Sequence, residues 1–362
     1  MNGSIENHTH ASSSRQKVSS NRPARCCRKH RGLAALIAFS PLLLAPGIAA
    51  ANCAPEEPDS GYVDSDGDGF DDNLVAPDAV IVAGSLGCDS RVASGSKLVK
   101  STVADVSGVG ASSTVVQSTL NRVFLGANSH VDRATLGAPE AEAILGESSV
   151  VLPGARVFAA SIGKNARLHR NANVNGGLGI DFMRLGDNLT LGQKARISIR
   201  NLGDDATIGA RVEIGESTQA GDRFKIGNDS RWDDGGVIGD NVSIGNKVII
   251  SGGFNAGDGV VIDNAVTVDF VVSLGSYTTI ERAVSVGGYT DIGSNSLIMN
   301  NASIGSQVTI GDRVLIGRQA SIGDGANIGN GSIVDLGAVV PAGSEIPANH
   351  IFTNDGTVSP LP

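Results

Sequence analysis

The sequence has few aromatic residues and few cysteines. Of its 362 residues, 4% are Phe, Trp or Tyr, and there are one Trp and four Cys. Globular enzyme cores rely on large aromatic side chains, so this composition favours a repetitive β architecture over such a core. Gly, in contrast, is abundant at 48 residues, and no long helix-like pattern is present. The length alone would allow two ordinary domains.

A long apolar run occurs only near the N-terminus. The segment 33–50, LAALIAFSPLLLAPGIAA, follows the basic stretch RPARCCRKHRG and precedes the small residues of AAANC. It is short for a membrane span and contains Pro41 and Pro46. The layout predicts a signal peptide over 1–51 and an exported chain: periplasmic, cell-surface or secreted. Lipidation at Cys53 is the alternative, but Asn52 occupies a position where such signals have a small residue.

Positive charge is scarce outside this leader. The whole chain carries a net charge of −9, and the leader contributes seven Lys or Arg and one acid, so the chain without it carries about −15. An acidic surface without a basic stripe repels nucleic acid and anionic lipid. We therefore expect neither nucleic-acid binding nor a stable membrane span in the mature chain.

Two cysteines remain once the leader is removed. Cys53 and Cys88 would then form the one pair of thiols in an oxidising compartment. This favours a disulfide between them, and two unrelated thiols are the alternative.

An acidic stretch between these cysteines, DSDGDGFDDN, carries the pattern of a cation-binding loop. Asp64, Asp66 and Asp68 alternate, Gly69 allows a sharp turn, and Asp72 stands at the ninth position. Oxygen ligands in this order suit calcium, so Ca²⁺ is the expected ion for the segment 52–88. The stretch resembles the calcium loops of thrombospondin type 3 repeats. Val75 replaces the bidentate Glu of an EF-hand, and an acidic solvated linker is the alternative.

A strict six-residue period governs the C-terminal half of the chain. Every sixth residue from Leu202 to Ile346 is apolar, at all 25 positions, and Gly follows 16 of them. The fifth residue of each hexad is mostly small or Val. A period of six fits neither an amphipathic helix nor an ordinary half-buried strand, so it indicates short strands separated by corners, which bury their apolar side chains only when coils stack. Gly, Asn and Asp at the second to fourth positions, as in IGDN (238–241), suit a left-handed corner backbone.

These hexads resemble the hexapeptide-repeat family. The resemblance implies an all-β, single-stranded, left-handed parallel β-helix with triangular coils of about 18 residues. It covers the regular region 202–349 without interruption. Upstream, the period recurs with five-residue joins over 125–201, and 89–124 is rich in Val, Ser and Thr without a fixed period, so we expect an irregular β-solenoid over 89–201. Residues 350–362 form the C-terminal tail, and its ending TVSPLP indicates disorder.

Few histidines are available for catalysis, six in the whole chain. Many hexapeptide-repeat proteins are acyltransferases, and the resemblance implies for them a catalytic His beside a cleft between subunits, usually with an extruded loop. Residues 202–346 contain neither a His nor an insertion, so only His130, His169 and His350 remain beyond the leader. A zinc carbonic anhydrase, the other enzymatic branch, needs three His with a close pair, which is missing. In the segment SRWDDGGV (230–237), Trp232 stands beside two Asp, a pattern that suits a notch for stacking a sugar. The alternative is that Trp232 fills an irregular part of the core.

The pattern as a whole favours an exported, non-catalytic β-solenoid with a structural, surface or interaction role, associated with calcium. An acyltransferase-like enzyme that uses His130 or His169 beside a carboxylate is the alternative. A cytoskeletal polymer like the bactofilins has a similar composition but conflicts with the leader. Residues 18 apart should lie above one another, which aligns four outward aliphatic side chains on one face: Val261, Leu297, Leu315 and Ile333. This face predicts self-association, or contact with another extracellular surface or matrix component.

Overall fold

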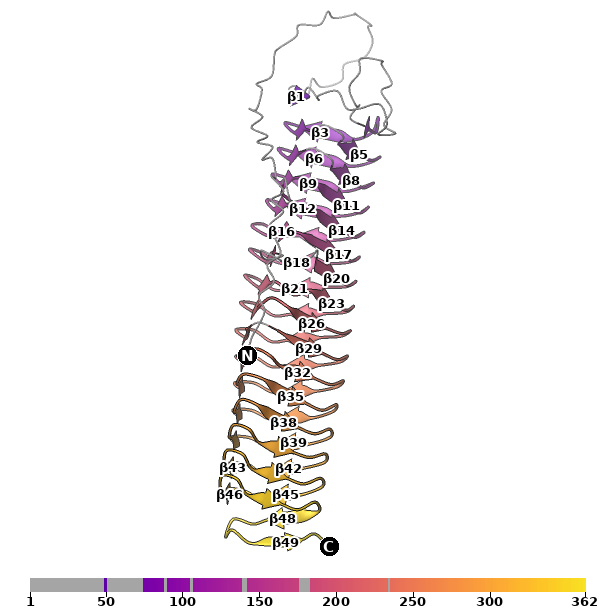
Figure 1. Ribbon diagram of the computed structural model, residues 1–362. Coiled ribbons are helices and arrows are strands. Elements are labelled where there is room, and N and C mark those ends of the chain that lie inside the picture. Colours follow the sequence, from indigo (N-terminus) through magenta and orange to yellow (C-terminus); the bar gives the residue numbers. More distant parts are fainter. Residues whose placement is uncertain are drawn as a thin grey trace, which may run out of the picture. The chain divides into compact units, whose positions relative to one another are not determined.

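The computed structural model describes residues 49–50, 74–87, 90–104, 107–138, 142–175, 183–233 and 235–362. All of them lie in the compact unit Leu44–Pro362. The described chain is a left-handed parallel β-helix, in which each coil passes through three sheets and stacks on the coil before it (Figure 1). This confirms the predicted fold class. The part of the chain that the structure describes has no helix long and apolar enough to cross a membrane.

The first sheet, sheet A, has 16 parallel strands, and each pairs with the strand three elements further along the chain. In order these are β1 (Ala49–Ala50), β4 (Ser85–Leu86), β7 (Thr102–Val103), β10 (Thr119–Leu120), β13 (Thr135–Leu136), β16 (Arg156–Phe158), β19 (Asn173–Asn175), β22 (Arg196–Ile197), β25 (Glu213–Ile214), β28 (Arg231–Trp232), β31 (Ile249–Ile250), β34 (Thr267–Val268), β37 (Ser285–Val286), β40 (Ser303–Ile304), β43 (Ser321–Ile322) and β46 (Val339–Val340).

Sheet B also has 16 parallel strands. They are β2 (Leu74–Val75), β5 (Arg91–Val92), β8 (Gly108–Val109), β11 (Val123–Leu125), β14 (Ala143–Leu145), β17 (Ala160–Ile162), β20 (Met183–Leu185), β23 (Asn201–Leu202), β26 (Thr218–Ala220), β29 (Gly236–Ile238), β32 (Asn255–Ala256), β35 (Val272–Leu274), β38 (Thr290–Ile292), β41 (Thr309–Ile310), β44 (Asn327–Ile328) and β47 (Glu345–Ile346).

Sheet C follows the same parallel order until its last strand, which is antiparallel. Its strands are β3 (Val80–Val82), β6 (Lys97–Val99), β9 (Thr114–Val116), β12 (His130–Asp132), β15 (Val150–Val151), β18 (Arg167–Leu168), β21 (Thr190–Leu191), β24 (Thr207–Ile208), β27 (Lys225–Ile226), β30 (Ser243–Ile244), β33 (Val261–Ile262), β36 (Thr279–Ile280), β39 (Leu297–Ile298), β42 (Leu315–Ile316), β45 (Ile333–Val334), β48 (His350–Phe352) and β49 (Val358–Pro360). We call the turns between strands the A–B, B–C and C–A corners, after the sheets they connect.

The core is a column of aliphatic side chains inside the coils. All 25 residues that the six-residue period marks as inward are buried, from Leu202 at 4% exposure to Ile346 at 1%. The fifth hexad position points inward as well, and carries Val248, Val314 or Ala320, each almost fully buried. Two inward positions per hexad therefore build the core, as the sequence predicts.

Glycine at the second hexad position has a different role in the corners from the predicted one. The backbone is left-handed at the fourth hexad position, where residues such as Arg211 (φ 56°), Lys247 (φ 56°) and Asn295 (φ 58°) stand. Glycine at the second position has no such φ. It is needed because a Cβ on Gly227 would lie 2.6 Å from the carbonyl carbon of Gly245 in the next coil. The second-position glycine thus allows close stacking of corners, and the left-handed turn at the fourth position is made mostly by residues with side chains, and in some coils by glycine, such as Gly325 (φ 67°).

Many serines of the irregular region, 89–201, point into the same core. In the early coils the small inward residue is often Ser, and its hydroxyl bonds to the backbone of the neighbouring coil. Ser101 Oγ donates to Val115 O at 3.1 Å, and accepts from Ser118 N at 3.3 Å. A buried hydroxyl is tolerated there because both its donor and acceptor functions are used. Strands of the three sheets already occur before the predicted boundary at residue 89, namely β1 to β4.

The C-terminal segment is ordered, contrary to the expected disorder. The chain turns after β48, and β49 returns antiparallel along it, with Ile351 opposite Ser359. Asp355 holds the turn by accepting hydrogen bonds from the Thr353 and Thr357 hydroxyls and from Thr357 N, and these bonds lower the pKa of its carboxyl to about 2. The antiparallel strand covers the free edge of β48, which would otherwise be a template for pairing with another chain.

Candidate functional site

His130 is the histidine that the structure places beside a carboxylate. It lies on β12 in sheet C, and Asp132 is two residues further on, so both side chains point outward from the same face of the strand. Thr114 and Val150 stand opposite His130 on the neighbouring strands. The site is half-buried at both residues of the pair.

A neighbouring arginine positions the Asp132 carboxylate. Arg133 donates from Nε to Oδ1 at 3.1 Å and from Nη2 to Oδ2 at 3.0 Å, and this pairing raises the pKa of the guanidinium. A bidentate fork restricts the rotation of a carboxylate. Asp132 is therefore held on the His130 face of the strand in an ion pair with Arg133.

The other two histidines have different surroundings. His169 lies at a C–A corner, where its backbone N–H donates to Leu191 O at 2.9 Å, and Leu152 and Gly192 occupy the equivalent corner positions of the adjacent coils. His350 begins β48, and its Nδ1 lies 2.8 Å from Ala348 O. These registers bring an acidic side chain to neither residue, so His130 is the better candidate for acid–base chemistry.

Trp232 does not form a sugar-stacking surface. Its side chain is 1% exposed and packs edge-to-face between Phe224 and Phe254, with ring centroids 6.4 and 5.7 Å away. Its Nε1 donates to Gly235 O at 3.2 Å, which satisfies the buried donor. Asp233 pairs with Arg231 at 2.7 Å. The core interpretation of this segment is correct.

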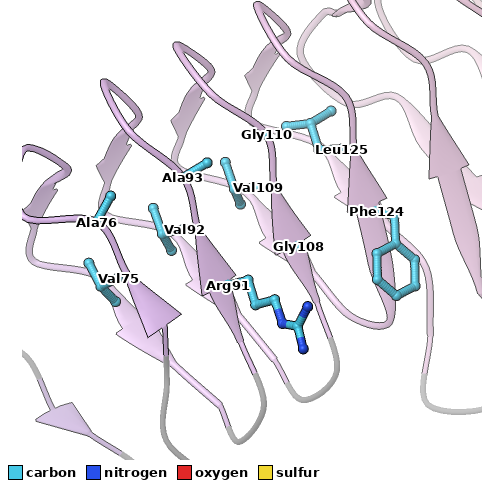
Figure 2. Close-up of a pocket in the computed structure, with 10 residues that line it drawn as sticks. All are labelled: Val75, Ala76, Arg91, Val92, Ala93, Gly108, Val109, Gly110, Phe124 and Leu125. Atoms are coloured by element: carbon cyan, nitrogen blue, oxygen red, sulfur yellow. The ribbon is translucent and has the colours of Figure 1, made fainter. Parts of the chain in front are cut away.

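An apolar groove of about 530 Å³ runs along the first coils of sheet B. Arg91, Gly108 and Phe124 face each other on three consecutive strands, and Figure 2 shows Arg91 and Phe124 extending on either side of the glycine. Because Gly108 has no side chain, the sheet surface is hollowed between them. The groove suits an aliphatic group, and the sequence did not predict it because a lone outward glycine in an irregular region carries no periodic signal. Its lining is Val75, Ala76, Arg91, Val92, Ala93, Gly108, Val109, Gly110, Phe124 and Leu125.

The predicted calcium and disulfide residues cannot be placed. Asp64, Asp66, Asp68, Asp72, Cys53 and Cys88 lie outside the described residues, as does the predicted leader except for Ala49 and Ala50. Elsewhere, in the described ranges, no group of three or more His, Cys, Asp or Glu is arranged to hold a metal. Calcium binding, the disulfide and export stay predictions.

The four predicted surface aliphatics share one face, as the 18-residue spacing implies. On sheet C, Val261 pairs with Thr279, then come Leu297, Leu315 and Ile333 in register. Val261 is 41% exposed and the other three are half-buried, because each covers its neighbours. The row continues to Ile351 on β48, which the sequence assigned to the tail. We call these five aliphatic residues the sheet C stripe.

Comparison with known proteins supports the repeat family. Residues 289–324 match the model of the bacterial transferase hexapeptide (six repeats), and residues 307–342 match the hexapeptide repeat of succinyl-transferase. No curated protein matches the chain by sequence.

Several solved structures share the fold at low similarity. A structure described as an acetyltransferase from Desulfovibrio desulfuricans G20 is 10% identical, with a TM-score of 0.29, over 77% of this chain and 69% of that one. The UDP-N-acetylglucosamine acyltransferase of Arabidopsis is 15% identical, with a TM-score of 0.22, over 78% and 69%. The corresponding O-acyltransferase of Moraxella catarrhalis is 12% identical, with a TM-score of 0.22, over 66% and 71%. Likeness of this size carries no argument about the activity of this chain.

The family models correct the functional expectation. A non-catalytic structural role was predicted, but the repeats over 289–342 match models named for transferases, which favours the enzymatic alternative. The missing His within 202–346 does not weigh against an enzyme, because His130 lies outside that region. Residues 289–342 of the chain carry hexapeptide repeats.

Proposed function

We propose that this protein is an acyltransferase-like enzyme in which His130 is the general base. The observation that carries the proposal is the placement of His130 and Asp132 on one outward face of β12, with the carboxylate oriented by Arg133. The transferase names of the two repeat models support the reaction class. The proposal is the enzymatic alternative that the sequence left open.

The chemistry follows from the roles these groups can take. The His130 imidazole accepts the proton of an acceptor hydroxyl or amine as that atom attacks the carbonyl carbon of an activated acyl group. The bond from the carbonyl carbon to the leaving sulfur or oxygen then breaks, and the imidazolium returns the proton to the leaving group. Asp132 stabilises the transient positive charge on His130, as an opposite charge on the same face does.

In this mechanism the groove on sheet B holds the acyl group. It ends at β11, the strand that directly precedes β12 in the same coil. Its lining consists mostly of Val, Ala, Gly and Leu, with the Phe124 ring at one side. An aliphatic acyl chain in this groove would lie on the face adjacent to the one that carries His130.

A substitution at His130 tests the catalytic assignment. We expect the full chain to transfer an acyl group from acetyl- or succinyl-coenzyme A to glucosamine, which offers both amine and hydroxyl acceptors. His130→Gln should lower kcat/KM by roughly 10²- to 10⁴-fold, because the general base is lost. Mass spectrometry of the acylated product measures the rate. His169→Gln is the matched control and should leave it within about twofold. Equal rates for His130→Gln and the unmodified protein, or no product from either thioester, would refute the assignment.

We also propose that copies of this chain associate through the sheet C stripe. Four consecutive outward aliphatics from Leu297 to Ile351 make this face unusually apolar for an acidic protein. The parallel strands of sheet C give the stripe flat surroundings that a second copy of the chain can cover, as in closed symmetric oligomers.

Charges placed on the stripe test this association. The purified chain should scatter light as an oligomer, and Leu297→Asp together with Leu315→Asp should convert it to a folded monomer, because two carboxylates would have to be desolvated at the contact. Ser285→Asp with Ser303→Asp places the same charges on sheet A, where both serines are exposed, and should leave the oligomer intact. A monomeric unmodified chain, or an oligomer unaffected by the stripe charges, would reject the interface.

A further inference from the structure

Two arginines share one edge of the coils in the C-terminal half. Arg282 and Arg318 occupy the same position of the C–A corner, two coils apart, with Asn300 between them. Backbone hydrogen bonds establish this register: Asn301 N donates to Arg282 O, and Gln319 N donates to Asn300 O, both at 3.1 Å. Coils stack roughly 4.8 Å apart, so the two arginine backbones are about 9.6 Å apart.

The side chains at this corner enclose a polar groove of about 440 Å³. It is lined by the two arginines, Ala283, Asn300 and Asn301. Ala283 stands where the coils that follow have Asn301 and Gln319, and its short side chain leaves the space open. The groove therefore combines room for a small group with two long cationic side chains that can reach into it.

The two guanidinium groups have no partner in the described residues that would neutralise them, since neither forms an ion pair or side-chain hydrogen bond there. Glu281, next to Arg282 in the chain, directs its Oε2 to Asn300 N at 2.9 Å and forms no ion pair with either arginine. Other arginines, such as Arg196 and Arg211, have acidic partners. Arg282 and Arg318 thus leave two uncompensated positive charges at one edge of a chain of net charge −9.

We propose that this corner binds a dianionic phosphate group. Two guanidinium forks present several N–H donors in the plane that phosphate oxygens accept, and their combined charge matches that of the dianion. The Asn300 side-chain amide, between them, can add a further donor. The site is separate from His130, which lies on the face of sheet C in a much earlier coil, so it goes beyond the proposed acyl transfer.

Calorimetric titration of the full chain with inorganic phosphate and with glucose 1-phosphate tests this site. Arg282→Gln with Arg318→Gln should weaken binding of both probes by roughly tenfold or more, because charge-assisted hydrogen bonds are lost. Arg313→Gln removes an exposed arginine from another corner and should leave affinity unchanged. Far-UV circular dichroism checks that the double variant keeps its fold, as exposed corner substitutions should.

The two probes distinguish the source of the phosphate. Tighter binding of glucose 1-phosphate identifies a phosphorylated sugar, and equal affinities identify the phosphate group alone; both results support the site. Absence of heat with both probes, or identical affinities in the unmodified chain and the double arginine variant, would overturn the proposal. His130→Gln should bind phosphate like the unmodified chain, so failure of the acyl-transfer proposal and failure of this one are separate results.

Discussion

We expect Ile304→Asp to lower the free energy of unfolding by more than about 4 kcal/mol, because it places a carboxylate inside the coil column. Ile304 is 2% exposed and stands on β40 between Val286 and Ile322 of the adjacent coils. The substitution removes the aliphatic contacts and also buries a charge that the neighbouring Val and Ile side chains cannot pair. Chemical denaturation followed by circular dichroism measures the loss.

The adjacent residue provides a matched control. Ser303 belongs to the same strand but points outward and is exposed. Ser303→Asp adds the same charge to the same coil and should change stability by no more than about 0.5 kcal/mol. If both variants unfolded at the same denaturant concentration as the unmodified chain, the inward assignment of the six-residue period would be wrong.

Gly293→Ala should cost about 3 kcal/mol, although it adds only a methyl group. A Cβ at this position would lie 2.5 Å from the carbonyl carbon of Gly311 and 2.6 Å from the backbone nitrogen of Asp312. Both atoms belong to the backbone of the next coil, so relief requires the coils to separate and their hydrogen bonds to lengthen. Denaturant unfolding measures this cost as well.

A second glycine separates stacking from backbone conformation. Gly325 has a φ of +67°, but a Cβ there would have no atom within 4 Å. Gly325→Ala should therefore cost only about 1 kcal/mol, the strain of a left-handed residue with a side chain. A loss for Gly293→Ala no larger than that for Gly325→Ala would show that close stacking of coils does not require glycine at the second position.

The inward and outward positions of the regular coils could be predicted almost completely, because each repeat is packed between two equivalent repeats. When a residue such as Ile304 lies between two equivalent coils, its environment follows from the period alone. The same 18-residue spacing is sufficient to align Val261, Leu297, Leu315 and Ile333 on one face. For Trp232 the sequence allowed either a sugar-stacking surface or a core position, because it could not show that Phe224 and Phe254 enclose the Trp232 ring.

The irregular coils and the C-terminus were harder to predict. In the early coils, buried Ser residues such as Ser101 replace Val or Ala, which obscures the apolar period although the inward geometry is unchanged. Residues 358–360 look like a disordered end because their pairing with β48 depends on a turn held by Asp355 and two threonines, and no repeat encodes that turn.

The candidate sites depended on tertiary structure even more strongly. Sequence named His130 as one of three isolated histidines, and the strand assignment placed Asp132 on its face. The 18-residue spacing places Arg282 and Arg318, 36 residues apart, on one edge, but the groove between them depended on the side chains that surround them and leave both arginines without partners in the described residues.

The sequence by itself determined the fold, the inward residues and the alignment of outward ones, because a fixed period imposes one local geometry on every coil. The tertiary structure decided what each glycine does, how the chain ends and which charged side chains meet. Those outcomes depend on how neighbouring coils stack. A backbone atom 2.6 Å from the position of an added Cβ excludes a side chain that the sequence alone would allow. A carboxylate already bonded to a backbone N–H likewise excludes a pairing that the sequence alone would allow.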